Sequence, residues 1–178
     1  GKALSTFKVS LEDVFSKRHF TDIEEFDRVT GGGIVEDSFM FLSGDPGIGK
    51  STLALQVALS LSKTLSCLYI SGEESISQVS SRVRRIQKEI PISFTLLNCG
   101  NLEDLIETIR KNSPSFIVLD SAQTVSSKNT SGNAGSVAQL RYLAEVLMRI
   151  CKEEKRALLL IGHVNKEGDL AGPKVLEH

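Results

Sequence analysis

Residues 44–52 read Gly44-Asp45-Pro46-Gly47-Ile48-Gly49-Lys50-Ser51-Thr52, which matches the pattern G-x-x-x-x-G-K-[ST] of a nucleotide-phosphate loop. The run before it, Phe39-Met40-Phe41-Leu42, is short and apolar, as expected of a buried strand. The run after it has the apolar period of a helix, carried by Leu53, Leu55, Val57, Ala58, Leu59 and Leu61. A glycine-rich turn between a strand and a helix is the context in which this pattern marks a nucleotide site.

The chemistry of this loop favours a bound triphosphate. Glycines have no Cβ, so the chain can aim successive backbone N–H groups at one anion, and the N-terminus of the next helix adds its dipole. Lys50 is expected to reach the β- and γ-phosphates, and the Ser51 hydroxyl is expected to ligate Mg²⁺. We therefore predict ATP and Mg²⁺ as cofactors, with residues 44–52 around the nucleotide. The alternative is a glycine-rich turn that only caps a buried helix.

The composition adds few limits. A chain of 178 residues that is 40% hydrophobic can form one globular domain, and a net charge of −1 indicates neither nucleic acid nor an acidic membrane. Cys67, Cys99 and Cys151 are far apart and form no C-x-x-C pair, which favours small buried residues in a reducing compartment. No apolar run approaches about 20 residues and no leader pattern is present. We expect a cytoplasmic protein without membrane contact.

Strand-like and helix-like segments alternate along the rest of the chain. Short apolar runs predict four further strands, at residues 67–70, 94–97, 116–119 and 157–161. Between them, one helix is predicted to start after Asn101 and end before Pro114, and a longer one to start after Gly135-Ser136. This alternation predicts an α/β fold, a mostly parallel central sheet with helices on both faces. Residues 1–37 are interpreted as a lead-in and residues 38–178 as the nucleotide-binding domain.

Polar residues follow three of these strands, at the edge where α/β proteins bind ligands. Asp120 follows four apolar residues, and in phosphate-loop ATPases the aspartate of this pattern holds the Mg²⁺ shell. Glu73 and Glu74 follow the second strand, where a carboxylate is able to accept a proton from the attacking water. His163 ends the last strand, within reach of a γ-phosphate. The alternatives are a turn-capping aspartate, two solvated loop acids and a structural histidine.

With these residues in place, the chain resembles the ATPase core of the RadA (Sms) family of bacterial DNA repair proteins, within the RecA-like superfamily of P-loop NTPases. The resemblance covers nearly the whole chain and is most specific after Gly162. Besides the phosphate loop, the matching stretches are EEFDRVTGGGI at 24–34, YISGEES at 69–75, LDSAQT at 119–124, GSVAQ at 135–139, GHVNK at 162–166 and AGPKVLEH at 171–178.

The resemblance implies roles for the polar residues. In this superfamily the first carboxylate after the second strand activates water, and Glu73 stands at that position, with Glu74 as the second candidate. His163 resembles the residue that senses the γ-phosphate. Asp120 and Ser51 match the residues that hold Mg²⁺.

Two loops resemble the DNA-facing loops of the superfamily, at about residues 125–135 and 164–174. Lys128, Lys166 and Lys174 are the candidates for phosphate contacts, which hold single-stranded DNA without reading its sequence. The alternative for each is a solvated lysine. Neither loop contains an aromatic residue, so base stacking is not indicated.

The family also carries parts that this sequence does not show. A four-cysteine zinc finger precedes the core, and a Lys-Asn-Arg-Phe-Gly motif and a Lon-protease-like domain follow it. We therefore expect a partial core, with zinc confined to the absent finger. The resemblance implies a hexameric ring for the full-length protein, in which a neighbour supplies an arginine or lysine. It also implies branched recombination intermediates and a RecA-type recombinase as partners.

Three functions are compared. The first is a DNA-dependent ATPase that processes or branch-migrates recombination intermediates in DNA repair. The second is a nucleotide switch resembling the KaiC regulators, which binds protein partners instead of DNA. A small-molecule kinase is disfavoured because its arginine-rich lid is missing. The one dense basic cluster, Arg82, Arg84, Arg85 and Lys88, falls in a predicted helix and is interpreted as a solvated face.

Overall fold

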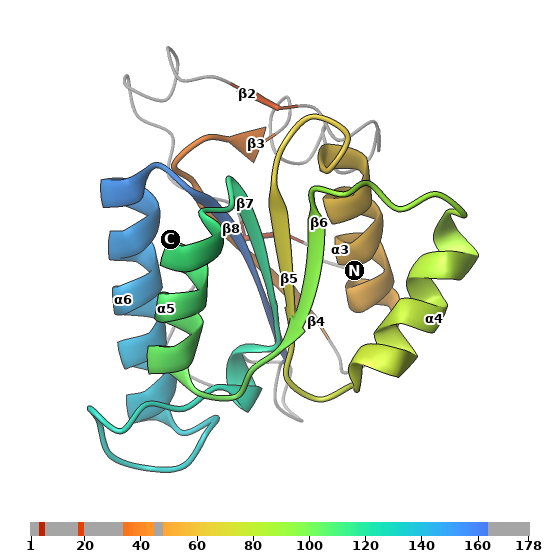
Figure 1. Cartoon of the computed structure of the whole chain (residues 1–178). Coiled ribbons are helices and arrows are strands. Elements are labelled where there is room, and N and C mark those ends of the chain that lie inside the picture. The colour runs from red at the N-terminus through yellow and green to blue at the C-terminus, as the bar shows by residue number, and fades with distance from the viewer. Residues whose placement is uncertain (1–3, 6–17, 20–33, 45–47, 164–178) are drawn as a thin grey trace.

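The computed structural model describes residues 4–5, 18–19, 34–44 and 48–163. Its centre is a six-stranded sheet in the order β1-β4-β8-β7-β5-β6 (Figure 1). The strands are β1 (Leu4–Ser5), β4 (Phe39–Gly44), β8 (Ala157–His163), β7 (Phe116–Asp120), β5 (Cys67–Ser71) and β6 (Phe94–Asn98). All neighbours are parallel except β1, which pairs antiparallel with β4. A second, two-stranded sheet pairs β2 (Arg18–His19) with β3 (Ile34–Val35).

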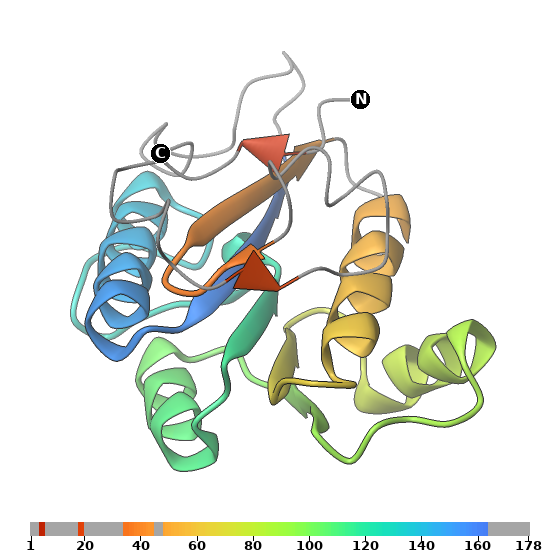
Figure 2. The same cartoon turned by 90° about the horizontal axis from the view of Figure 1, so that it is seen from above.

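In the described part of the chain, four α-helices cover the two faces of the sheet. They are α3 (Ile48–Leu61), α4 (Ile76–Ile86), α5 (Leu102–Asn112) and α6 (Val137–Glu154), and a short 3₁₀ turn, η1 (Ala122–Thr124), follows β7. Figure 2 shows α3 and α4 on one side of the sheet and α5 and α6 on the other. The predicted α/β fold with helices on both faces is confirmed.

Alternation along β4 shows how the sequence sets these layers. Phe39 and Phe41 belong to the apolar cluster that includes α5 and α6, whereas Met40 and Leu42 belong to the cluster that includes α3. Successive strand residues point to opposite faces, so a strand buried on both sides reads as a continuous apolar run. This is why the short apolar runs in the sequence located the parallel strands correctly.

Side-chain caps fix where the helices begin. Asn101 accepts from the Asp104 N–H at 3.0 Å and caps α5, as the sequence predicts. Ser136 caps α6, and Ser75 forms a capping box with Gln78 at the start of α4. These caps place the starts of α4, α5 and α6 just beyond the loops that leave the carboxyl edge of the sheet.

The cysteines and the helices bear on the expectations from composition. Cys67 and Cys151 are buried, and desolvation by burial raises the pKa of Cys67 to about 11 and of Cys151 to about 12. Both therefore behave as small apolar side chains, as predicted, while Cys99 is half-buried. Among the helices in the described ranges, none is both long and apolar enough to cross a bilayer.

The parallel register brings the polar strand ends to one edge. Ser71 of β5 pairs with Asp120 of β7, and Gly44 of β4 pairs with His163 of β8. Because β8 lies between β4 and β7, the end of the phosphate-loop strand is separated from Asp120 by a single strand. The candidate site is built along this edge.

Candidate functional site

The phosphate loop joins β4 to α3, as predicted. β4 ends at Gly44 and α3 begins at Ile48, while Asp45, Pro46 and Gly47 lie outside the described residues. A Cβ built on Gly49 would meet no atom of the described residues within 4 Å. The N–H groups of a helix N-terminus such as that of α3 suit an anion.

Two predicted metal-binding groups lie in direct contact. Ser51, in the first turn of α3, donates its hydroxyl to Oδ2 of Asp120 at 2.5 Å. Asp120 has the same strand parity as Phe116 and Val118, which pack in the cluster with α3, so its side chain faces that helix. Hydroxyl and carboxylate oxygens are the hard ligands that Mg²⁺ prefers, with nucleotide phosphates and water as the others. The pair therefore fits Mg²⁺.

Tyr69 is a site residue that sequence reasoning missed. Its hydroxyl donates to Oδ2 of Asp120 at 2.9 Å, and its side chain is fully buried. Burial, followed by the charge of Asp120, raises the pKa of Tyr69 well above its ordinary value, so the phenol stays protonated and remains a donor. A tyrosine within an apolar run reads as core, and only the register of β5 with β7 places its hydroxyl beside the carboxylate.

The β5–α4 turn, residues 72–75, carries the two candidate catalytic carboxylates. The Gly72 N–H donates to the Asp120 carbonyl at 2.8 Å, so the turn starts beside the predicted metal site. A Cβ on Gly72 would lie 1.9 Å from Oγ1 of Thr124, so only glycine fits there without a shift. Glu73 is exposed, and within the described residues its side chain makes no hydrogen bond or ion pair. Glu74, in contrast, forms an ion pair with Arg82.

Unpaired polar atoms gather between the ends of β7 and β8. Ser121 Oγ and His163 Nδ1 are both buried, and neither has a hydrogen-bond partner in the described ranges. The amide of Gln123 donates to the carbonyl of His163 at 3.4 Å, which ties η1 to the end of β8. Buried polar atoms normally find a partner. His163 pairs with Gly44 at the end of the phosphate-loop strand, so its unpaired Nδ1 fits a contact to a polar ligand at this edge.

The β7–α6 loop, residues 125–136, is held in place from two helices. The Gln139 amide, buried on α6, accepts from the Ser127 N–H at 2.8 Å, and its Nε2 is shared among the carbonyls of Ser127, Thr130, Ser131 and Gly132. From α5, the Glu103 carboxylate accepts from the Ser127 hydroxyl at 2.6 Å and from the Lys128 N–H at 3.2 Å. Sequence reasoning assigned no role to either residue, because Gln139 was only the last residue of the matching stretch GSVAQ and Glu103 lies in no matching stretch.

The predicted DNA-binding lysines are described in part. Lys128 is exposed on the β7–α6 loop, whereas Lys166 and Lys174, with the second loop, lie outside the described residues. The pKa of Glu103 is lowered, chiefly by the Ser127 hydroxyl and further by Lys128. The Glu103 carboxylate therefore lies against the loop that carries Lys128.

The basic cluster on α4 differs from its prediction. Arg84 and Arg85 are exposed, as expected of a solvated face, and Lys88 lies beyond the end of the helix. Arg82 is only 7% exposed, so its interpretation as a solvated side chain is wrong. Arg82 can be buried because its ion pair with Glu74 offsets the cost of desolvating the guanidinium.

Known proteins resemble this chain over most of its length. The profile of a family described as "AAA domain" matches residues 7–169. DNA repair protein RadA of Streptococcus pneumoniae is 45% identical over 158 residues, which cover 89% of this chain and 37% of that protein. RadA of Listeria monocytogenes is 47% identical over 163 residues, covering 91% and 35%, and RadA of Bacillus subtilis is 44% identical over 170 residues, covering 95% and 37%.

These matches show which proteins the chain resembles and what share of their length it covers. The chain spans a little over a third of the length of these RadA proteins. The resemblance that the motifs indicated is confirmed along nearly the whole chain, together with a nucleotide-binding fold of the P-loop type. The chain belongs to the AAA domain family, and its similarity within that family is to the bacterial DNA repair protein RadA.

Proposed function

We propose that this chain binds MgATP at the carboxyl edge of its sheet and hydrolyses it. The hydrogen bond from Ser51 to Asp120 carries the proposal, because it joins the phosphate-loop helix and the end of β7 through two oxygen groups suited to Mg²⁺. The AAA domain family to which the chain belongs supports the same activity.

The site residues divide phosphoryl transfer to water among them. Lys50 and the N–H groups of the phosphate loop bind the β- and γ-phosphates, and Ser51 and Asp120 hold Mg²⁺, which neutralises phosphate charge when bound. Glu73 accepts a proton from the attacking water while the oxygen of that water forms a bond to the γ-phosphorus. The bond to the β-γ bridging oxygen breaks, which leaves ADP and inorganic phosphate. His163 contacts the γ-phosphate and responds to its loss.

We further infer that hydrolysis is coupled to DNA. The similar proteins are named DNA repair proteins, which supports a role in repair. We propose single-stranded DNA and branched recombination intermediates as the partners, contacted through the β7–α6 loop and Lys128. Lys166 and Lys174 are proposed as further contacts. A complete site takes an arginine or lysine from a neighbouring copy, so we propose a ring-shaped homo-oligomer, with a RecA-type recombinase as a further partner.

Hydrolysis with and without single-stranded DNA tests this proposal. We expect DNA to raise the rate of ATP hydrolysis, and DNA affinity to fall steeply as salt rises, because phosphate contacts release counterions. A rate that DNA does not change, together with no salt-dependent binding, would contradict the DNA-coupled motor.

One observation favours a second function. The Glu103 carboxylate accepts from the backbone N–H of Lys128, which adds a negative charge beside the β7–α6 loop, and this loop has no aromatic residue, so the attraction of the loop for DNA is weakened. A nucleotide switch that binds a protein partner is therefore the second proposal. For this second function we expect the protein to bind a protein partner in a nucleotide-dependent way, and we expect DNA to leave its rate of ATP hydrolysis unchanged.

A further inference from the structure

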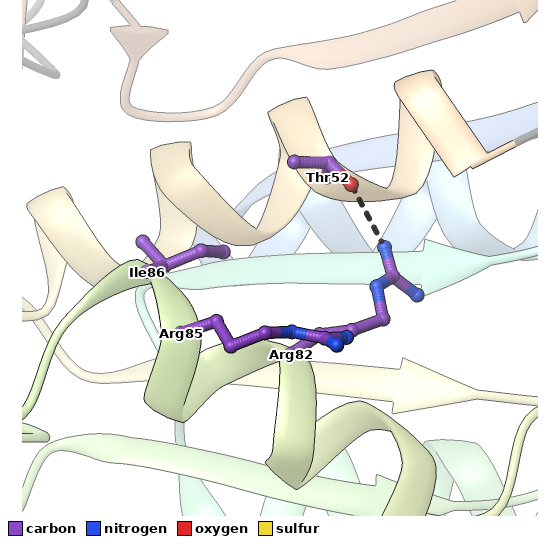
Figure 3. Close-up of a pocket in the computed structure, with 4 residues that line it drawn as sticks. All are labelled: Thr52, Arg82, Arg85 and Ile86. Atoms are coloured by element: carbon purple, nitrogen blue, oxygen red, sulfur yellow. Dashed lines mark hydrogen bonds between the residues drawn. The ribbon is translucent and has the colours of Figure 1, made fainter.

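Arg82 is a buried cation that links three segments of the nucleotide edge. It stands on α4, pairs through Nη1 with Oε1 of Glu74, and donates through Nη2 to Oγ1 of Thr52 at 3.2 Å. Figure 3 shows the Arg82 side chain reaching from α4 to Thr52 on α3. One side chain therefore connects α4, the β5–α4 turn and the phosphate-loop helix.

The geometry of this contact suits arginine specifically. A planar guanidinium presents donors in a fixed fork, so it bonds two acceptors at a set separation, whereas a lysine ammonium is a point charge on a flexible stem. A charge with so little exposure is also costly unless paired. Glu74 supplies the opposite charge, and its side chain is 32% exposed.

The two neighbouring glutamates are held very differently. The Glu74 carbonyl accepts from the Ser71 hydroxyl at 2.8 Å and from the Asn98 amide at 3.2 Å, and its carboxylate is engaged by Arg82. Glu74 is thus fixed through both backbone and side chain. Glu73 is exposed, and nothing in the described part of the chain engages its carboxylate. The β5–α4 turn therefore has one anchored carboxylate and one available carboxylate.

We propose that Arg82 is a positioning residue, which anchors Glu74 against Thr52 and thereby sets the turn that presents Glu73 to the attacking water. Glu74 is then part of the anchor and not the general base, which separates the two candidates that the sequence left together. The inference rests on the proposed ATP hydrolysis and deepens it. Misplacing a catalytic group by even about 1 Å costs up to roughly 100-fold in rate, so such an anchor has a measurable effect.

A cavity beside the contact makes Arg82 suitable for substitution. The cavity has a volume of about 190 Å³ and is lined by Thr52, Arg82, Arg85 and Ile86 (Figure 3). Because space is already present on that side of the guanidinium, Arg82→Lys removes the planar arrangement of donors without disrupting a close-packed core. Arg84→Gln, an exposed arginine on the same helix, is the matched control.

The decisive experiment is a double-mutant cycle on the full chain, with single-turnover ATP hydrolysis, fluorescent-nucleotide binding and thermal melting as readouts. We expect Arg82→Lys to lower the hydrolysis rate about tenfold, with nucleotide affinity within about twofold, while Arg84→Gln matches the wild type. In a Glu73→Gln background the same Arg82→Lys change should have less than about a twofold effect, because coupled residues are not additive. A tenfold loss in both backgrounds, or a loss explained by weaker nucleotide binding, overturns the proposal.

Glu74→Gln is a second, independent test of the proposal, and it can be used even if Arg82→Lys does not fold. Glutamine keeps an acceptor for Arg82 at the same place, so we expect a loss of about tenfold or less, well below the loss from Glu73→Gln. An equal loss from both glutamine variants makes Glu74 a base and overturns the assignment. If the wild-type chain binds no nucleotide or hydrolyses none, the proposed function fails. If it hydrolyses ATP and Arg82→Lys matches it, the positioning role alone fails.

Discussion

The β5–α4 turn and the β7–α6 loop leave the same edge of the sheet, and among the contacts that hold each segment is a buried polar side chain of the helix that follows it. For the turn the side chain is Arg82, which is 7% exposed and charged, and for the loop it is Gln139, which is 2% exposed and neutral. Arg82 engages one side chain of the turn and one of α3, whereas Gln139 engages backbone groups of its loop.

The difference between the two anchors follows from what each segment carries. The turn holds Glu74, so a cation balances its charge, and it leaves Glu73 available. The loop has mainly backbone groups to satisfy, and an amide both donates and accepts without adding charge. A charged anchor therefore lies next to the proposed chemistry, and a neutral anchor lies under the proposed binding loop.

The largest expected effect tests whether the β5–α4 turn, rather than the β7–α6 loop, carries the catalytic carboxylate. Glu73→Gln should slow ATP hydrolysis by roughly 100-fold or more while nucleotide still binds, because general-base terms are of that size. The matched control is Glu153→Gln, an exposed glutamate on α6. Unchanged turnover in Glu73→Gln, measured by phosphate release, would remove the chemical role from the turn.

The next effect tests the neutral anchor. Gln139→Ala leaves the Ser127 N–H and several loop carbonyls without their partner, and each unsatisfied buried group costs about 1–3 kcal/mol. We expect a loss of about 2–3 kcal/mol in the free energy of unfolding, measured with urea, and faster amide exchange at residues 127–132.

A matched substitution on α3 gives the reference for Gln139. Gln56 is an exposed glutamine, so Gln56→Ala should change the free energy of unfolding by less than about 0.5 kcal/mol. If Gln139→Ala is equally mild, the loop is held by something other than the amide, and the comparison between the two anchors does not hold.

A smaller effect tests where the two segments touch. Gly72 starts the turn, and a Cβ on it would lie 1.9 Å from Oγ1 and 2.5 Å from Cβ of Thr124, which ends η1 just before the loop. Gly72→Ala should therefore cost about 1–3 kcal/mol in the free energy of unfolding, since neighbouring atoms must shift. Gly49→Ala, with no atom within 4 Å of its Cβ, is the control and should not lower the melting temperature of the nucleotide-free protein.

The smallest effect is a dependence on pH at the outer side of the loop. The Glu103 pKa is lowered from 4.5 by the Ser127 hydroxyl, so its carboxylate stabilises the folded state above that pH and loses this contribution as pH falls through the lowered value. The stability difference between wild type and Glu103→Gln should be present at neutral pH and shrink as the pH falls below the ordinary Glu pKa of 4.5. A difference that stays constant down to pH 3 would show that ionisation of Glu103 plays no part.

The comparison also shows what the sequence was able to predict. The strands, the phosphate loop and the contact between Ser51 and Asp120 follow from apolar runs and a motif with fixed spacing, both of which are local signals. Arg82 and Gln139 depend on which helix face meets which loop, and this is a tertiary property. Tyr69 likewise gains its role only from the register of β5 with β7. Arg82 was misjudged because a run of basic residues on a helix is usually solvated.

The strand order has a consequence for how the domain is made. β8 is the last strand of the described residues, yet it lies between β4 and β7, and Phe39 pairs with Leu158 across most of the chain. Within the described residues, β4 has β8 as its parallel neighbour and the two-residue β1 on its other side. Pairing between distant segments is slow, and during synthesis it waits for the later one. The phosphate-loop strand therefore completes its parallel pairing only once β8 has left the ribosome, which delays assembly of the nucleotide edge until all the strands of the described sheet have been synthesised.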